Sequence, residues 1–135
     1  MYHMSGKTAS NILLIACLAV AANLLPVTAR AAELVMFDSA GCIYCQRWER
    51  DVGSLYDKTA EAKILPLRRI DISRQSSSGV TLSEPVHYTP TFIVVDKGRE
   101  IGRIEGFSSD DQFWGLLDGI AAKIVATVAP EPNRI

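Results

Sequence analysis

The sequence predicts an α/β domain in which a mixed four-stranded sheet is flanked by helices. Four short apolar runs have the length and composition of strands. Two other stretches carry apolar residues at spacings of three and four, which is typical of amphipathic helices. The order along the chain is strand–helix–strand and then strand–strand–helix, with no internal repeat or linker, so we expect one domain.

The first half of this domain begins with a strand and a helix. An apolar run over 33–37 is too short for a helix and predicts a buried strand, followed by a turn over 38–41. Apolar residues then recur at helical spacing over 42–56, so we expect a helix that Gly53 weakens and the following polar residues end.

A second strand and a polar connection follow. Residues 65–72 alternate between apolar and polar side chains and predict a strand, with Pro66 at its start or at the sheet edge. Residues 73–84 are polar and leave room only for a short helix or a loop.

The second half is a hairpin and a long helix. Residues 91–95 predict a third strand, and a tight turn over 96–99 leads into a fourth strand over 100–105. The clearest helix covers 109–128, where Ser109 with Gln112 three residues on can form a capping box.

The N-terminus has the layout of a secretory signal peptide. A short polar segment precedes 14 largely apolar residues over 12–25, and Ala29-Arg30-Ala31 supplies small residues for cleavage. The apolar run is short for a membrane span; retention as an anchor and lipidation of Cys17 are the alternatives. We therefore expect residues 1–31 to be a signal peptide, 32–129 the folded domain and 130–135 a flexible tail.

Composition limits the classes of partner. The chain has 14 basic and 15 acidic residues and a formal net charge of -1, which argues against a nucleic-acid binder. Its hydrophobic content of 48% is typical of a globular protein. Cleavage after Ala31 leaves two cysteines, Cys42 and Cys45, in a compartment where disulfides form and persist.

The pair Cys42-Ile43-Tyr44-Cys45 falls at a strand-to-helix junction. Free N–H groups and the helix dipole favour a thiolate at the first position, an effect of about 0.3–2 kcal/mol. Cys45 lies one turn further along, close enough to form a disulfide. We therefore expect Cys42 to attack a substrate and Cys45 to resolve the product.

Such a pair could instead bind zinc, bind Cu(I) or form a purely structural disulfide. Zinc requires four ligands, and His87 is the one further nitrogen or sulfur ligand in the mature chain apart from methionine. A Cu(I)-delivery module is conceivable with Met36 and His87 near the two thiolates. A purely structural disulfide would close only a very small loop and stabilise little. We expect redox chemistry with no metal and no organic cofactor.

A second motif, Tyr88-Thr89-Pro90-Thr91, places a proline directly before the third strand. With the cysteine pair and the element order, it makes the chain resemble the thioredoxin superfamily over most of its mature length. The resemblance implies a cis Pro90 facing the cysteines, and backbone groups of Thr89 that pair with an extended substrate. It also implies that Gly106, with Phe107 after it, borders the binding groove.

Departures from thioredoxin itself are also visible. The position before the first cysteine is Gly41 instead of tryptophan, and Tyr44 is similar to the glutaredoxin residue. By the resemblance we expect both residues to contact the substrate. Met36 stands where thioredoxin has the buried aspartate that takes the proton of the resolving thiol. Asp38, Glu49 and water remain candidates for that task.

Within this superfamily, the chain looks most like the SoxS-type periplasmic thioredoxins of bacterial sulfur oxidation. The features that carry this resemblance are the segment Gly41-Cys-Ile-Tyr-Cys45 with Trp48-Glu49, the basic strand around Arg68 and the signal peptide. That resemblance implies a monomer in the periplasm. Its partner would be a protein with a reducible disulfide or modified cysteine, such as the sulfur-oxidation carrier. A membrane thiol transporter would supply the electrons.

The sequence therefore predicts an exported thiol–disulfide oxidoreductase working in the reducing direction, with a Cu(I) module and a disulfide-introducing oxidase as alternatives. Several conspicuous residues are expected to be bystanders. Trp48 and Trp114 are predicted to pack in the core or groove wall, and His87 to lie on the surface. The basic residues form either a solvated face or a flank of the groove: Arg47, Arg50, Arg68 and Arg69.

Overall fold

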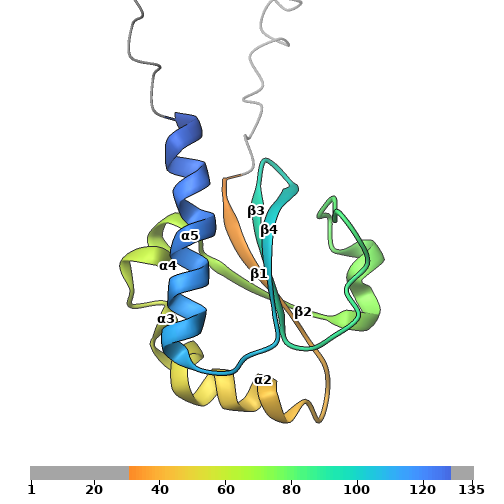
Figure 1. The fold of residues 1–135 in the computed structure, drawn as a ribbon. Coiled ribbons are helices and arrows are strands. Elements are labelled where there is room, and N and C mark those ends of the chain that lie inside the picture. Colours follow the sequence, from red (N-terminus) through yellow and green to blue (C-terminus); the bar gives the residue numbers. More distant parts are fainter. Residues whose placement is uncertain (1–30, 129–135) are drawn as a thin grey trace, which may run out of the picture.

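A computed structural model describes residues 31–128 of the chain. Its four strands form one sheet in the order β2-β1-β3-β4 (Figure 1). β1 pairs in parallel with β2 and antiparallel with β3, and β3 pairs antiparallel with β4. The predicted mixed sheet is therefore confirmed. The strands are β1 (Glu33–Asp38), β2 (Leu67–Asp71), β3 (Thr91–Asp96) and β4 (Arg99–Glu105).

The helix predicted after the first cysteine is one continuous element with a wider turn inside it. It consists of α2 (Ile43–Trp48), the π-helical η1 (Glu49–Gly53) and α3 (Ser54–Tyr56). A short helix α4 (Ala60–Ile64) was not predicted from the sequence. The side chain of Thr59 caps it by accepting a hydrogen bond from the backbone N–H of Ala62.

The other two helices follow the prediction closely. The connection after β2 forms the 3₁₀ helix η2 (Ile72–Ser77), and the last helix is α5 (Asp110–Val128). At the start of α5 the backbone N–H of Gln112 donates to the Ser109 hydroxyl at 3.3 Å, as expected for a helix cap.

Two apolar layers cover the two faces of the sheet. Helices α2 to α5 lie on one face and the connection containing η2 lies on the other (Figure 1). Trp48 is fully buried at the centre of the helix-side layer, with ring centroids 4.9 Å from Phe92 and 5.5 Å from Phe113. Trp114 stacks on Tyr56. Both tryptophans therefore pack, as predicted.

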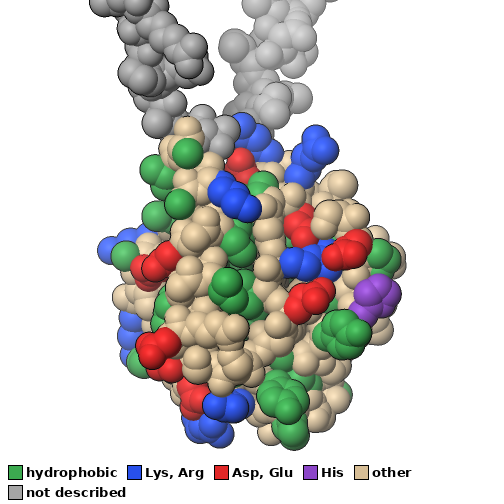
Figure 2. Space-filling view, viewed as in Figure 1, with side chains coloured by type: hydrophobic (Ala, Val, Ile, Leu, Met, Phe, Trp, Pro, Cys, Tyr) green, Lys and Arg blue, Asp and Glu red, His purple; other side chains and the backbone are tan. Residues whose placement is uncertain are grey.

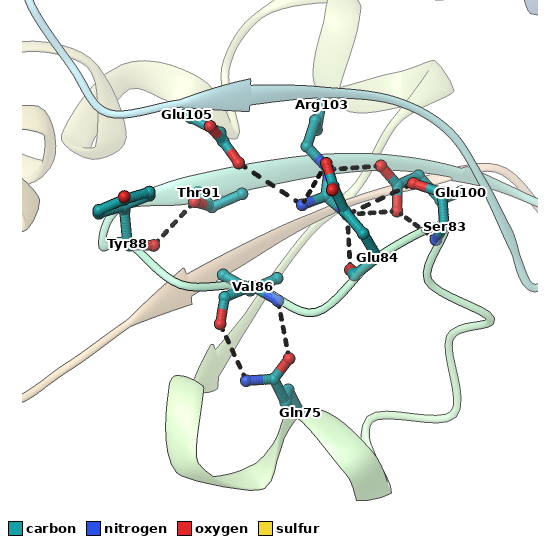
Figure 3. Close-up of polar contacts among 9 residues, drawn as sticks. All are labelled: Gln75, Ser83, Glu84, Val86, Tyr88, Thr91, Glu100, Arg103 and Glu105. Carbon is teal, nitrogen blue, oxygen red and sulfur yellow. Dashed lines mark hydrogen bonds and ion pairs between the residues drawn. The ribbon is translucent and has the colours of Figure 1, made fainter.

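The long connection between β2 and β3 is fastened both to itself and to β4 (Figure 3). The Gln75 side chain donates to the carbonyl of Val86 and accepts from its N–H, at 3.0 and 2.8 Å. Thr81 forms a parallel bridge with Arg99. Arg103 on β4 donates to the backbone carbonyl of Glu84 at 2.9 Å. These contacts hold the segment that leads to Thr89 in place.

Both ends of the described domain lie at the same end of the sheet. β1 starts there and α5 finishes there, while α2 begins at the opposite end (Figure 1). None of the helices among residues 31–128 combines the length and apolar character needed to cross a bilayer. Apart from Ala31, the predicted signal peptide lies outside the described residues, as does the predicted tail over 130–135.

Candidate active site

The two cysteines of the Cys-x-x-Cys segment form a disulfide, with Cα atoms 5.3 Å apart. They follow a tight turn after β1 in which Gly41 has a φ of 77°, a conformation that glycine adopts without strain. The backbone N–H of Cys42 donates to the carbonyl of Ser39 at 3.2 Å and closes this turn.

The two sulfurs have different surroundings. Cys42 is the N-cap of the helix, and its Sγ accepts a hydrogen bond from the backbone N–H of Cys45 at 3.1 Å. Cys42 is half-buried, whereas Cys45 is only 6% exposed and packs in the helix-side core. An N–H group aimed at the more accessible sulfur stabilises negative charge on it.

A second segment, just before β3, lies against the cysteine turn. The Thr89–Pro90 peptide bond is cis, Pro90 is buried and Thr89 is half-buried. The hydroxyls of Ser39 and Thr89 are hydrogen-bonded at 2.9 Å, so the turn before Cys42 contacts the segment before Pro90 directly. The antiparallel register of β1 and β3 explains this, because Phe37 at the end of β1 pairs with Thr91 at the start of β3.

A groove of about 480 Å³ opens beside the cysteines. It contains three residues predicted to bind substrate, namely Tyr44, Thr89 and Gly106. Gly106 has a φ of 77° and its N–H donates to the carbonyl of Pro90 at 2.7 Å. The groove then continues along the end of β4 and the first turns of α5, over Arg103, Ile104, Glu105, Phe107, Ser108, Ser109, Gln112, Phe113 and Leu116.

Two carboxylates, those of Asp38 and Glu49, are candidates for accepting the proton of the Cys45 thiol. Met36 is fully buried at the position where thioredoxin has an aspartate. Asp38 lies two residues further along β1, on the same helix-facing side because strand side chains alternate. Burial first, and then the nearby carboxylate of Asp71, raises the pKa of Asp38 above its usual value. Glu49 is held by Arg69 through two hydrogen bonds.

The four arginines do not form one basic patch. Arg47 lies over the ring of Phe107 and donates to the Ser108 carbonyl, so it flanks the groove. Arg68 pairs with Glu33 at the far end of β1, and Arg69 pairs with Glu49. Arg50 pairs with its neighbour in the sequence, Asp51. His87 is exposed, as predicted.

Ser39 is a site residue that the sequence reasoning missed. It accepts from Cys42 through its carbonyl and bonds Thr89 through its hydroxyl. The available signal was a hydroxyl side chain in the turn between strand and cysteine, a place where serine commonly bonds nearby groups. Within residues 31–128 no three or more His, Cys, Asp or Glu side chains are grouped to hold a metal ion.

This fold and this disulfide define a class of protein. A Cys-x-x-Cys disulfide at a helix N-terminus, on a mixed sheet and beside a cis proline, is the arrangement of a thiol–disulfide oxidoreductase. The chain matches the family model described as a thioredoxin-like domain over residues 27–121, and it belongs to that family.

Solved structures agree with the assignment. The periplasmic thioredoxin SoxS from Paracoccus pantotrophus, in its reduced form, is 33% identical with a TM-score of 0.66, covering 69% of this chain and 98% of that one. A Malassezia sympodialis thioredoxin (14% identity, TM-score 0.52, 67% and 77% covered) and a Helicobacter pylori thioredoxin-fold protein (18%, 0.53, 75% and 75%) share the fold. Curated protein sequences gave no match.

Proposed function

We propose that this protein is an exported reductase that transfers two electrons to a disulfide or a modified cysteine of a periplasmic partner. The observation that carries the proposal is the asymmetry of the cysteine pair. Cys42 is half-buried and its Sγ accepts the N–H of Cys45, whereas Cys45 is only 6% exposed. An attacking thiolate must be reachable and stabilised, and a resolving thiol must be close and shielded.

The exchange follows from that arrangement. The Cys42 thiolate attacks one sulfur of the partner disulfide, a Cys42–partner disulfide forms and the other partner sulfur leaves as a thiolate. Cys45, once deprotonated, attacks the Sγ of Cys42. The second partner thiolate leaves and the Cys42–Cys45 disulfide remains. Both electrons come from the two thiols, so the step needs no metal or organic cofactor, and an external dithiol must regenerate the reduced pair.

The substrate lies in the groove beside the cysteines. Thr89 and Gly106 line its inner end, with the buried Pro90 between Thr89 and β3. Gly41 leaves the approach to Cys42 without a side chain. The backbone of Thr89 pairs with an extended segment of the partner next to the mixed disulfide. Tyr44, which is 53% exposed, contacts the partner from the helix.

Asp38 is proposed as the group that accepts the proton of Cys45. It lies on the helix-facing side of β1, and its raised pKa makes it a stronger base than an ordinary aspartate. Glu49 is the weaker candidate because Arg69 occupies both of its carboxylate oxygens.

Similarity to a periplasmic thioredoxin supports the compartment, and the predicted signal peptide is consistent with it. The resemblance to SoxS-type thioredoxins supports the carrier protein of sulfur oxidation as the partner and a membrane thiol transporter as the electron source. A Cu(I)-delivery role is the competing proposal because it would use the same two sulfurs.

Trapping tests the proposal directly. Cys45→Ser removes the resolving thiol, so the mixed disulfide on Cys42 accumulates with exported proteins, and Cys42→Ser is the matched control that traps nothing. Failure of Cys45→Ser to accumulate any mixed disulfide would reject a partner reductase. Insulin reduction with dithiothreitol, compared with Cu(I) titration, separates exchange from copper delivery. Equilibration with glutathione decides the direction, because a potential near that of strong oxidants would make the protein an oxidase.

A further inference from the structure

The outer edge of β4 has two differently occupied halves. Near its start, the N–H of Glu100 donates to the carbonyl of Thr81 at 3.0 Å, and the N–H of Thr81 donates to Gly98 at 2.9 Å. The connection after η2 therefore covers this first half in the manner of a short added strand.

The second half of the same edge faces the groove. The N–H of Gly106 points toward β3, since it bonds the carbonyl of Pro90. Backbone groups alternate along a strand, so the N–H and C=O groups of Glu105 and Arg103 point away from β3. Both residues line the groove that also contains Thr89. The outward-facing backbone groups of β4 therefore lie next to the groove segment that contains Thr89 and Gly106.

The wall on the helix side of this edge carries an apolar strip next to the polar Ser109 and Gln112. Ile104, Phe113 and Leu116 line it, and the apolar side chain of Leu116 is 45% exposed to solvent. The space-filling view shows hydrophobic side chains gathered between the edge of the sheet and the last helix (Figure 2). An extended peptide lying on the edge would direct alternate side chains onto this wall.

The wall on the opposite side is negatively charged. Arg103 is surrounded by the carboxylates of Glu84, Glu100 and Glu105 at 3.7, 2.6 and 3.5 Å (Figure 3). Three negative charges around one positive charge leave two negative charges in excess. Arg103 is only 12% exposed, whereas Glu84 is 66% exposed, so an approaching peptide meets carboxylates rather than the guanidinium.

We infer that the free half of the β4 edge binds an extended segment of the protein substrate as an added strand, with a basic side chain against Glu84 and Glu105. This inference rests on the proposed reductase function. It adds a second contact region, beyond the backbone of Thr89, that selects partners by the chain around their cysteine. A basic, extended flanking segment is the feature that would be selected.

The test compares substrates that share one leaving group. The probes are peptides with a single central cysteine blocked by 2-nitro-5-thiobenzoate, carrying strand-forming flanks with either two lysines or two glutamates. The small symmetrical disulfide of the same aromatic thiol is the reference substrate. The readout is the ratio of the rate constant for each peptide to that for the reference.

For the unsubstituted protein we expect the lysine peptide to react about three- to tenfold faster than the glutamate peptide, with the difference shrinking as salt rises. Glu105→Pro removes the outward N–H without touching the β3 ladder, because proline is accepted at such edge positions. Its lysine-peptide ratio should fall about three- to tenfold, the loss expected for one hydrogen bond. Glu105→Ala keeps that N–H and should lose only the charge preference.

A second pair of variants tests the apolar wall. Leu116→Lys places a charge in the groove, while Val125→Lys makes the same change on the same helix at a residue that is 60% exposed and outside the groove. Leu116→Lys should lower the peptide ratio and Val125→Lys should not. Two results would overturn the inference: equal reactivity of the lysine and glutamate peptides with the unsubstituted protein, or equal peptide-to-reference ratios for all four variants. Neither result would affect reduction of the small disulfide. Loss of that reaction in the unsubstituted protein would instead reject the proposed function.

Discussion

Ser39 connects the two chain segments that make up the candidate site. Its carbonyl accepts from Cys42 and its hydroxyl is bonded to Thr89, fifty residues away in the sequence. The relative position of the Cys42 sulfur and the groove wall therefore depends in part on one small side chain.

Replacing Ser39 by alanine should weaken this connection. We expect the free energy of unfolding to fall by about 0.5–1.5 kcal/mol. The substitution should also lower the rate constant for protein substrates more than the rate constant for a small disulfide. Denaturant unfolding and the two rate constants measure this. Ser54→Ala is the matched control, since its hydroxyl makes only a long bond, 3.4 Å, to the Arg50 carbonyl on the surface. Equal effects of the two substitutions would refute the positioning role.

Asp38 should make stability and the resolving step depend on pH. Its pKa is raised by burial and by Asp71, so its contribution to stability is fully present below the usual aspartate pKa and is lost as pH rises through the raised value. Asp38→Asn should therefore be more stable than the parent at pH 7, with a gain that shrinks toward pH 4. Thermal unfolding across this range measures it.

The same substitution should slow the resolving step. Without a base near Cys45, release of the reduced partner from the mixed disulfide should fall about tenfold or more near neutral pH. Stopped-flow measurement of this release, with Glu49→Gln as the comparison, distinguishes the two carboxylates. A larger loss in Glu49→Gln would assign the proton to Glu49.

At the scale of elements, the helix that carries Cys42 widens into a π-helical turn at Gly53. A Cβ built there would lie 2.3 Å from a Glu49 carboxylate oxygen and 2.7 Å from the Trp48 ring. The close approach of this turn to the central tryptophan requires glycine. Glycine otherwise lowers helix stability, which is why the sequence indicated a weakened helix.

Gly53→Ala should therefore destabilise the protein by about 1–3 kcal/mol, because the ring of Trp48 has no room to shift in the core. Gly119→Ala in α5 is the matched control. Apart from its chain neighbours and the backbone of its own helix, no described atom lies within 4 Å of its added Cβ, and a helical alanine should stabilise by about 0.5–1 kcal/mol. Denaturant unfolding of both variants checks the opposite signs. Stabilisation by both would contradict the packing account.

The elements differ in how far the sequence predicts them. Strands with strong apolar runs and α5, with its cap and long apolar stripe, were predicted to within about two residues at each end. The helix α4 was missed because five residues are too few to show a periodic pattern. The strand β2 begins at Leu67 rather than Leu65, because the residue before Pro66 ends α4 instead.

At the scale of the whole molecule, Arg103 and Glu100 hold the connection between β2 and β3 against the sheet. Burial raises the pKa of Glu100, but hydrogen bonds from Arg103 and Ser83 outweigh it, so the pKa lies below its usual value. The stability this carboxylate contributes is present above its usual pKa and is lost as pH falls through the lowered one.

Glu100→Gln should lower stability at pH 7 by about 1–3 kcal/mol, since it weakens charge-assisted bonds to a guanidinium that is largely buried. The difference from the parent should disappear in acid. Glu84→Gln is the control, because this exposed carboxylate lies 3.7 Å from Arg103 and should contribute less than about 1 kcal/mol. Unfolding curves at several pH values measure both. A pH-independent difference would refute the role of ionised Glu100.

The sequence predicts only those parts of the site whose residues lie close together along the chain. The cysteine pair and the proline segment each show in a few consecutive residues. The Ser39–Thr89 bond and the groove along β4 depend on which strands become neighbours, and no short pattern carries that information. The clustering of Glu84, Glu100 and Glu105 around one arginine arises in the same way, from a connection that folds back onto an edge strand.

The domain enters and leaves at the end of the sheet opposite the start of α2 (Figure 1). A reporter, affinity handle or solid support joined through either terminus would therefore point the cysteine face outward. Immobilised protein can accordingly be used to capture partners without a long linker to expose the cysteine face.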